Sequence, residues 1–150
     1  MTTRRLTRLM RRRNFKLNAK IIGLMRRDVM GSLRILVVED EVLIGMLLED
    51  MLTAMGHAVC AIASSENAAV AAAERDKPAM LIVDARLHQG SGVAAVDRIH
   101  RSGFVPHIFV TGDSRGVLEL KPNAIVLEKP FTEAMLAAAI DRVHESSKTS

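Results

Sequence analysis

The sequence predicts an α/β fold, in which a doubly wound parallel sheet of five strands is covered by helices on both faces. From residue 33 onward, short aliphatic runs alternate with segments of helical periodicity, which is typical of such sheets. Of the 150 residues, 49% are hydrophobic, which is enough for the core of one domain of ordinary size. Aromatic residues make up only 3%, without Trp or Tyr, so the core must be packed from aliphatic side chains.

Five apolar runs, separated by polar and turn residues, are the expected strands. They lie at residues 34–38, 57–61, 80–83, 107–110 and 124–127. The third run is the most continuously aliphatic, so we expect it at the centre of the sheet. Ligands of a doubly wound sheet bind outside the carboxyl ends of its strands, and the functional residues are therefore expected there.

The connecting segments are expected to form helices at residues 43–55, 65–75, 92–101 and 132–144. Ser65 and Thr132 are the residue types that cap helix N-termini. The fourth connection, residues 112–123, differs from the others because it contains Gly116, Pro122 and only a brief apolar group. Its helix is therefore limited to one or two turns.

Charge divides the chain into two unlike regions. Residues 1–30 contain ten Lys or Arg and a single acidic residue, for a charge of +9, whereas the remainder carries −5 of the overall +4. We interpret the chain as a basic extension that is disordered or partly helical, a folded domain and a short tail, at residues 1–32, 33–146 and 147–150. Two alternatives for the extension are a basic arm for anionic membrane or nucleic acid and residues encoded upstream of a true start at Met30.

Composition and motifs argue against several classes of protein. The single Cys60 cannot form a disulfide within the chain and indicates a reducing, cytoplasmic compartment. No apolar stretch approaches the roughly 18 residues that a membrane span needs. The histidines show no ligand pair at i, i+4 and no nearby Cys, which argues against zinc, and there is no Gly-rich phosphate loop.

Polar residues follow four of the five expected strands at their carboxyl ends. Glu39 and Asp40 follow the first, Asp84 the third, Thr111 the fourth and Lys129 the fifth. Three carboxylates at one apolar edge repel one another unless a cation joins them or one of them takes up a proton. Because oxygen ligands suit a hard ion, the sequence predicts a Mg²⁺ site at this edge.

Asp84 is the candidate nucleophile, because it ends the central strand and so projects from the middle of the edge. A carboxylate beside Mg²⁺ can accept a phosphoryl group, and Thr111 and Lys129 would hydrogen-bond and neutralise the transferred oxygens. Taken singly, these residues have ordinary explanations as helix caps, a turn residue and a solvated charge. Their order along the strands carries the specificity.

Four segments contain these residues. They are Arg34-Ile-Leu-Val-Val-Glu-Asp-Glu41, Leu81-Ile-Val-Asp84 with Gly92 beyond it, Phe109-Val-Thr-Gly112 and Glu128-Lys-Pro-Phe131. Together they resemble the receiver domains of bacterial response regulators, and the likeness extends from about residue 33 to the end of the last helix. The resemblance implies a flavodoxin-like sheet of strand order 2-1-3-4-5 with a shortened fourth helix.

The resemblance also implies roles for individual residues. Asp84 would take a phosphoryl group from a phosphohistidine on a sensor histidine kinase or a histidine phosphotransfer protein, and autodephosphorylation would reset the protein. Asp40 and Asp84 would bind Mg²⁺ directly, Glu39 through water and Arg86 through its backbone carbonyl. Thr111 and Lys129 would bind the phosphoryl oxygens.

The chain departs from the family pattern at two places that bear on signalling. Leu87 and His88 stand where Met-Pro is usual after the phosphoacceptor, which suggests a differently shaped loop. Val126 occupies the position of the usual aromatic switch residue, three residues before the family lysine. We therefore expect residues 113–122, rather than an aromatic side chain, to reorder on phosphorylation.

Two further features of the sequence concern how long the phosphoryl group persists and which subgroup of receivers the chain resembles. Arg86 and Asp113 occupy positions that tune phosphoryl lifetime in the family. A pair between them would hinder the attacking water, and a solvated pair without effect is the alternative. Residues 109–112 resemble a receiver subgroup common in alphaproteobacteria with a Phe-Ala-Thr-Gly pattern, from which Val110 departs.

Three functions are compatible with these residues. The first is a stand-alone receiver, not an enzyme on small molecules, that contacts a downstream protein or drains phosphate from a shared kinase. It would have no DNA-binding domain, and homodimerisation stays open. The second is a magnesium-dependent phosphatase or hydrolase with Asp84 as nucleophile, although such enzymes generally place a second carboxylate where Arg86 stands. The third is a degenerate receiver that acts as a binding scaffold, against which the intact site residues argue.

Overall fold

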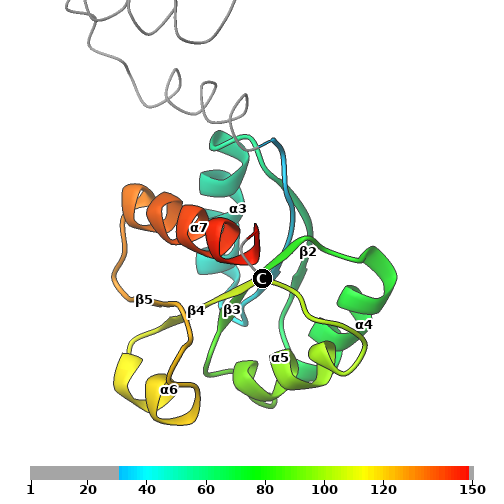
Figure 1. Ribbon diagram of the computed structural model, residues 1–150. Helices are drawn as coiled ribbons and strands as arrows, with labels where there is room; N and C mark the ends of the chain where they lie inside the picture. Colours follow the sequence, from blue (N-terminus) through cyan, green and yellow to red (C-terminus); the bar gives the residue numbers. More distant parts are fainter. Residues whose placement is uncertain (1–30, 149–150) are drawn as a thin grey trace, which may run out of the picture.

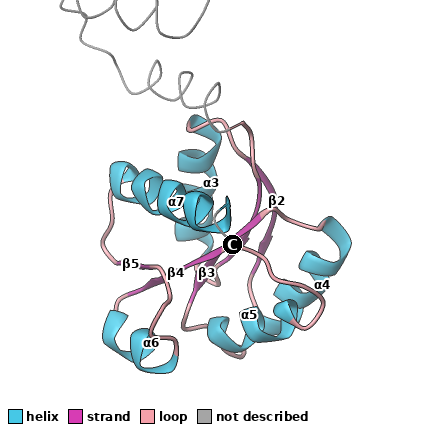
Figure 2. Cartoon of the chain, in the orientation of Figure 1, coloured by secondary structure: helices cyan, strands magenta, loops and turns pink. Residues whose placement is uncertain are grey.

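The computed structural model describes residues 31–148 as an open parallel sheet with helices on both faces (Figures 1 and 2). The strands are β1 (Arg34–Val38), β2 (Ala58–Ala63), β3 (Met80–Asp84), β4 (His107–Thr111) and β5 (Val126–Glu128). They pair in parallel in the order β2-β1-β3-β4-β5, which confirms the predicted fold class and strand order. The predictions made for residues 1–30 and for residues 149–150 lie outside the described residues.

The helices alternate with the strands and cover both faces. They are α3 (Val42–Ala54), α4 (Glu66–Asp76), α5 (Gly92–His100), α6 (Ser114–Leu120) and α7 (Glu133–Lys148). In Figure 1, α3 and α7 lie on one face of the sheet and α4 and α5 on the other, and each pair closes its own aliphatic core. Within residues 31–148, no helix combines the length and the apolar character that crossing a bilayer requires.

Successive side chains of a strand enter the two cores in turn. Ile35 and Val37 of β1 belong to the core under α3 and α7, whereas Leu36 and Val38 belong to the core under α4 and α5. All residues of β3 are buried, which fits its central place and its continuously aliphatic sequence. The central strands are thus held rigidly on both faces, up to the edge where the candidate residues emerge.

Three elements differ by two or more residues at one end from the bounds expected, and the others agree to within about one residue. β2 continues to Ala63, because a bulge in its pairing with β1 shifts the register and keeps the later residues in the sheet. β5 is only three residues long, because the N–H of Ala124 is used in a turn with the carbonyl of Lys121 at 3.0 Å. α7 runs to Lys148 rather than to residue 144, since no Gly or Pro interrupts it.

The helix caps follow the sequence. Ser65 and Thr132 each accept a hydrogen bond from the backbone N–H three residues on, at 3.1 and 3.2 Å. α6 has seven residues, about two turns, which confirms the short fourth helix. Asp113 caps it by accepting from the N–H of Gly116 at 3.1 Å. This cap fixes the Asp113 side chain beside the carboxyl end of β4.

Candidate functional site

The pairing register brings the predicted residues to one edge of the sheet. β1 and β3 pair up to the residues that directly precede Glu39 and Asp84, so these two side chains emerge next to each other. β4 and β5 pair up to Thr111 and Glu128, and Lys129 follows directly. Residues from four parts of the chain are therefore neighbours because parallel strands end together.

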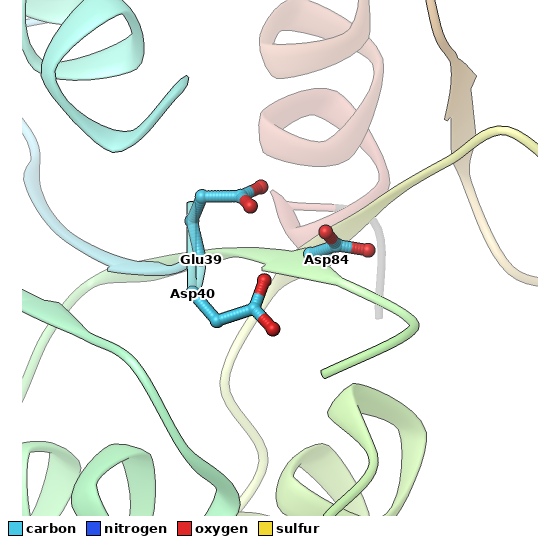
Figure 3. A group of neighbouring side chains, drawn as sticks. All are labelled: Glu39, Asp40 and Asp84. Atoms are coloured by element: carbon cyan, nitrogen blue, oxygen red, sulfur yellow. The ribbon is translucent and has the colours of Figure 1, made fainter. Parts of the chain in front are cut away.

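Glu39, Asp40 and Asp84 form an acidic cluster at this edge. One carboxylate oxygen from each lies within 4.8 Å of the others, and in Figure 3 the side chains of Glu39 and Asp40 extend toward the side on which Asp84 lies. Glu39 and Asp84 are only 2% and 7% exposed. Like charges this close and this far from water require a proton or a cation.

The repulsion and the burial within the cluster have a clear effect on the pKa of Glu39. The pKa of Glu39 is raised to about 7, chiefly by burial and also by the charge of Asp84, although the Glu41 N–H and the Lys129 ammonium oppose the rise. Its Oε1 accepts a hydrogen bond from the Glu41 N–H at 3.1 Å. Its Oε2 is buried and accepts no hydrogen bond. A buried carboxylate oxygen without a donor suits a cation, so the residues present fit a hard ion such as Mg²⁺.

The Lys129 ammonium supplies a counter-charge inside the cluster. Its Nζ lies 3.0 Å from Oδ2 of Asp84 and 3.5 Å from Oε2 of Glu39. Desolvation acts to lower the pKa of Lys129, but the hydrogen bond and charge of Asp84 and the charge of Glu39 raise it overall. The backbone N–H of Lys129 donates to the Thr111 carbonyl at 2.8 Å, and the following peptide bond to Pro130 is cis. One ammonium among three carboxylates leaves the cluster short of positive charge.

Asp84 is held at both carboxylate oxygens. Oδ1 accepts from the backbone N–H of Arg86 at 3.0 Å, and Oδ2 accepts from Nζ of Lys129. The first turn of α5 lies against its backbone, since a Cβ added to Gly92 would come within 1.9 Å of the Asp84 carbonyl oxygen. The carboxylate is thus oriented in advance, and α5 can approach this closely only because residue 92 is Gly.

The remaining predicted residues line the same open depression, of about 510 Å³. Thr111 and Arg86 lie in its wall together with Asp84 and Lys129. Oγ1 of Thr111 accepts from the Asp113 N–H at 3.1 Å. The Arg86 guanidinium and the Asp113 carboxylate pair at 3.0 Å, with side chains 79% and 46% exposed. The pair considered from the sequence therefore forms, while the backbone carbonyl of Arg86 as a metal ligand stays a prediction.

His88 also belongs to this site, although the sequence indicated only that it lies in a differently shaped loop and not that it contacts the acidic cluster. Its backbone N–H donates to Oδ2 of Asp40 at 2.7 Å, and Nδ1 of its imidazole contacts the same oxygen. Burial acts to raise the pKa of Asp40, but the hydrogen bonds and the charge of His88 lower it overall. The signal available in the sequence was its place, four residues after Asp84, where Met-Pro had been expected.

Comparisons with known proteins point to one family. The family model for the response regulator receiver domain matches residues 35–141. The phyllosphere-induced regulator PhyR of Methylorubrum extorquens is 36% identical over 112 residues, which cover 72% of this chain and 42% of that protein. The transcriptional regulatory protein PdtaR of Mycobacterium tuberculosis is 33% identical, with coverage of 72% and 55%. The chain spans about half the length of these curated relatives.

Solved structures agree with that comparison. The response regulator PhyR of Brucella abortus superposes with a TM-score of 0.76 at 31% identity, covering 86% of this chain and 54% of that one. The receiver domain of PhyR from Erythrobacter litoralis gives a TM-score of 0.71 at 32% identity, covering 77% of this chain and 92% of that one. The similarity to these two proteins therefore extends over most of the chain described above.

Proposed function

The chain belongs to the response regulator receiver family, and from this premise we propose that it is the phosphoacceptor of a two-component phosphorelay, phosphorylated on Asp84. The observation that carries the proposal is the position of Asp84, 3.0 Å from the Lys129 ammonium and beside a buried Glu39 oxygen that lacks a donor. The phosphoryl donor is a phosphohistidine on a sensor histidine kinase or a histidine phosphotransfer protein.

The proposed transfer is a substitution at phosphorus. A carboxylate oxygen of Asp84 forms the new P–O bond while the P–N bond to the donor imidazole breaks, and the imidazole leaves with the electron pair. Lys129 is within reach to neutralise the oxygens of the transferred group. Because Oγ1 of Thr111 accepts its hydrogen bond from Asp113, its own O–H remains available to donate to a phosphoryl oxygen.

We assign Mg²⁺ to Glu39, Asp40, Asp84 and the backbone carbonyl of Arg86. When bound, the ion offsets the negative charge of the carboxylates and of the phosphoryl oxygens. Because the pKa of Glu39 is about 7 without the ion, binding near neutral pH would displace the proton from those molecules in which Glu39 carries one. The buried Oε2 of Glu39, which has no hydrogen bond and only the Lys129 ammonium 3.5 Å away, would gain a second positive neighbour.

An apolar surface beside the pocket supports a protein as the donor. The first two turns of α3 expose large aliphatic side chains, namely Val42, Leu43, Met46 and Leu47, at 74%, 80%, 55% and 49%. This helix begins at Val42, after the acidic pair Glu39 and Asp40 and with Glu41 as its N-cap. Grouped exposed apolar side chains mark contact surfaces for other proteins, and this group is on the helix that follows two of the acidic residues of the site.

We place the output of the phosphorylated state in a contact with a downstream protein. PhyR of Bartonella quintana, which is 27% identical and matches 87% of this chain and 57% of that one, is described as an anti-anti-sigma factor. Because Val126 replaces the usual aromatic residue, residues 113–122 remain the segment that we expect to reorder. Equal amide exchange there with and without a phosphoryl mimic would exclude this segment.

Intact mass spectrometry tests the proposal. The chain is incubated with acetyl phosphate and Mg²⁺, and we expect a stable increase by one phosphoryl group that is absent in Asp84→Asn and after chelation of the ion. Thr111→Val and Lys129→Met keep the carboxylate but remove donors to the phosphoryl oxygens. They are expected to slow adduct formation without moving its site.

The same experiment separates the alternatives. Consumption of the donor without a lasting adduct would favour a hydrolase, although the position two residues beyond Asp84 holds Arg86, whose guanidinium pairs with Asp113. An absence of any reaction would leave a binding scaffold. The proposal therefore fails unless the adduct both forms and depends on Asp84.

A further inference from the structure

Residues 85–91 form the loop that joins β3 to α5, and the start of this loop is part of the site. The backbone N–H of Arg86 donates to Oδ1 of Asp84 at 3.0 Å, so the loop backbone helps to orient the reacting carboxylate. Arg86 faces Ser91 in an antiparallel bridge across the base of the loop. The position of the Arg86 backbone therefore depends on what holds Ser91.

Glu66, the first residue of α4, holds the far end of this loop. Its carboxylate Oε2 accepts from the Ser91 N–H at 3.0 Å, and its own backbone N–H donates to the Gln89 carbonyl at 3.1 Å. Its Oε1 accepts from the guanidinium of Arg98 on α5 at 3.1 Å. Because α4 and α5 lie side by side on one face of the sheet (Figure 1), this one carboxylate links both helices and the loop.

The intervening Gly90 shows how closely Glu66 and the loop approach each other. A Cβ added to Gly90 would lie 2.5 Å from both Cβ and Oε2 of Glu66. The φ of Gly90 is +91°, in the left-handed region that favours glycine. The loop can therefore reach the Glu66 carboxylate only because residue 90 has no side chain.

The Glu66 carboxylate is not needed to cap its own helix. Ser65 caps α4 by accepting from the Ala68 N–H at 3.1 Å. A capping box would place the acidic residue at the third helical position, whereas Glu66 stands at the first. Hydrogen bonds from the Ser91 N–H and from Arg98 lower the pKa of Glu66, so the carboxylate is charged at neutral pH. Its hydrogen bonds to the loop and to α5 are thus charge-assisted.

We propose that Glu66 is a positioning residue for phosphoryl transfer to Asp84. Its carboxylate holds Ser91, and through the bridge it keeps the Arg86 backbone where the N–H binds Asp84 and the carbonyl can serve the metal. The inference rests on the proposed function, because it takes Asp84 to be the phosphoacceptor and the Arg86 carbonyl to be a metal ligand. Glu66 itself touches neither the reacting carboxylate nor the ion, and it acts by orienting the groups that do.

Titration of the full-length chain with Mg²⁺, followed by amide NMR shifts, tests the inference. In Glu66→Ala the new residue favours the helix, but the Ser91 N–H loses its acceptor. We expect the Mg²⁺ affinity and the rate of Asp84 adduct formation to fall about fivefold, and the Ser91 amide to exchange faster with water. Because the titration reports on folded molecules, a loss confined to global stability would not change it. Glu133→Ala removes the same charge from the exposed first residue of α7 and should alter none of these quantities.

Three further variants test the contact itself. Glu66→Gln keeps an oxygen that can accept from the Ser91 N–H, so it should restore most of the Mg²⁺ affinity. Gly90→Ala should lower the affinity as Glu66→Ala does, because the new Cβ would push the Glu66 side chain away. Gly103→Ala is its matched control, since Gly103 also has a left-handed φ, of +132°, but a Cβ there would meet nothing within 4 Å.

The inference is overturned if Glu66→Ala binds Mg²⁺ as tightly as the wild type, or if Glu133→Ala loses as much affinity. It is also overturned if Gly90→Ala and Gly103→Ala behave alike, or if Glu66→Gln is as weak as Glu66→Ala, because the hydrogen bond to Ser91 would then not matter. In each of these cases a wild-type adduct on Asp84 leaves the proposed function standing. A wild-type chain that neither binds Mg²⁺ nor forms the adduct would overturn both.

Discussion

The two edges of the parallel sheet differ in how their polar groups are satisfied. At the carboxyl edge, Glu39 and Asp84 are buried beside one ammonium, and a carboxylate oxygen accepts no hydrogen bond. At the amino edge, ring nitrogens of His100 and His107 both lie 3.0 Å from the Val105 carbonyl oxygen. Since that oxygen can only accept, both nitrogens carry protons and donate to it.

The difference distinguishes a functional site, at the carboxyl edge, from a part of the fold that contributes only to stability, at the amino edge. The rings of His100 and His107 also pack edge to face at 4.9 Å, so the amino edge gains both hydrogen bonds and ring contacts. The carboxyl edge instead raises the pKa of Glu39 to about 7 by burial. A fold that only had to be stable would not gather these carboxylates, and the strain therefore points to a function that needs them.

The largest effect is expected from one added methyl group at the carboxyl edge. In Gly92→Ala the new Cβ would lie 1.9 Å from the Asp84 carbonyl oxygen, so α5 or the end of β3 must move. We expect the free energy of unfolding, measured by chemical denaturation, to fall by about 3 kcal/mol. The yield of the Asp84 adduct should fall as well, because the carboxylate loses its position.

Gly112→Ala is the matched control at the same edge. A Cβ there would meet nothing within 4 Å, so the free energy of unfolding should change by less than about 0.5 kcal/mol. Equal destabilisation by the two substitutions would show that the close approach of α5 to Asp84 is not the reason why Gly92→Ala lowers the free energy of unfolding.

Glu39→Gln should show that the carboxyl edge lowers stability. The pKa of Glu39 is about 7 in the folded chain against an ordinary 4.5. Its stabilising contribution is therefore complete below about pH 4.5 and is lost as the pH rises through 7. At pH 8 with a chelator, the Gln variant should be more stable than the wild type by roughly 1–3 kcal/mol.

The measurement is denaturant unfolding at pH 5 and pH 8, paired with Mg²⁺ titration. Glu39→Gln should bind Mg²⁺ more weakly although it is the more stable protein. Glu49→Gln, at an exposed position of α3, should change neither quantity. A loss of stability in Glu39→Gln at pH 8 would contradict the assignment of electrostatic strain to this carboxyl group.

The sequence predicted the carboxyl edge in part, for a physical reason. Side chains that directly follow aliphatic runs must emerge where parallel strands end, so Asp84 and Lys129 could be placed together from periodicity alone. The need for a proton or a cation was also predictable, but the depth of burial that selects Glu39 was not. His88 was missed because its contact with Asp40 depends on a loop whose shape is set by Glu66, far away in the sequence.

The amino edge should respond to pH with the opposite sign. Burial lowers the pKa of His107 below its ordinary 6.5, so the folded chain resists protonation that the unfolded chain accepts. Stability linked to His107 is present above pH 6.5 and is lost as the pH falls. The loss at pH 5.5 is at most about 1.4 kcal/mol. His107→Phe keeps a ring but cannot take up a proton, so the free energy of unfolding should fall less between pH 7.5 and pH 5.5 than in the wild type. Denaturant unfolding at the two pH values measures this. The same pH dependence in both proteins would contradict the prediction.

The smallest change in stability is expected at the rim of the pocket. The Arg86–Asp113 pair is 3.0 Å long but largely exposed, so Arg86→Gln should change the free energy of unfolding by less than about 0.5 kcal/mol. Its effect should be on kinetics, because a guanidinium held across the mouth of the depression hinders the water that attacks the phosphoryl group. We expect the Asp84 adduct to decay several-fold faster in Arg86→Gln.

Arg75→Gln provides the matched comparison, because Arg75 forms a similar pair with Asp76 at 2.8 Å, at the end of α4 and outside the depression. That variant should leave the decay rate of the adduct unchanged, as followed by intact mass after removal of the donor. If the Asp84 adduct decays at the same rate in Arg86→Gln and in Arg75→Gln, the Arg86–Asp113 pair is a solvated ion pair without effect on the adduct. If the adduct decays faster only in Arg86→Gln, the Arg86–Asp113 pair controls the lifetime of the phosphorylated Asp84 although it contributes almost nothing to folding.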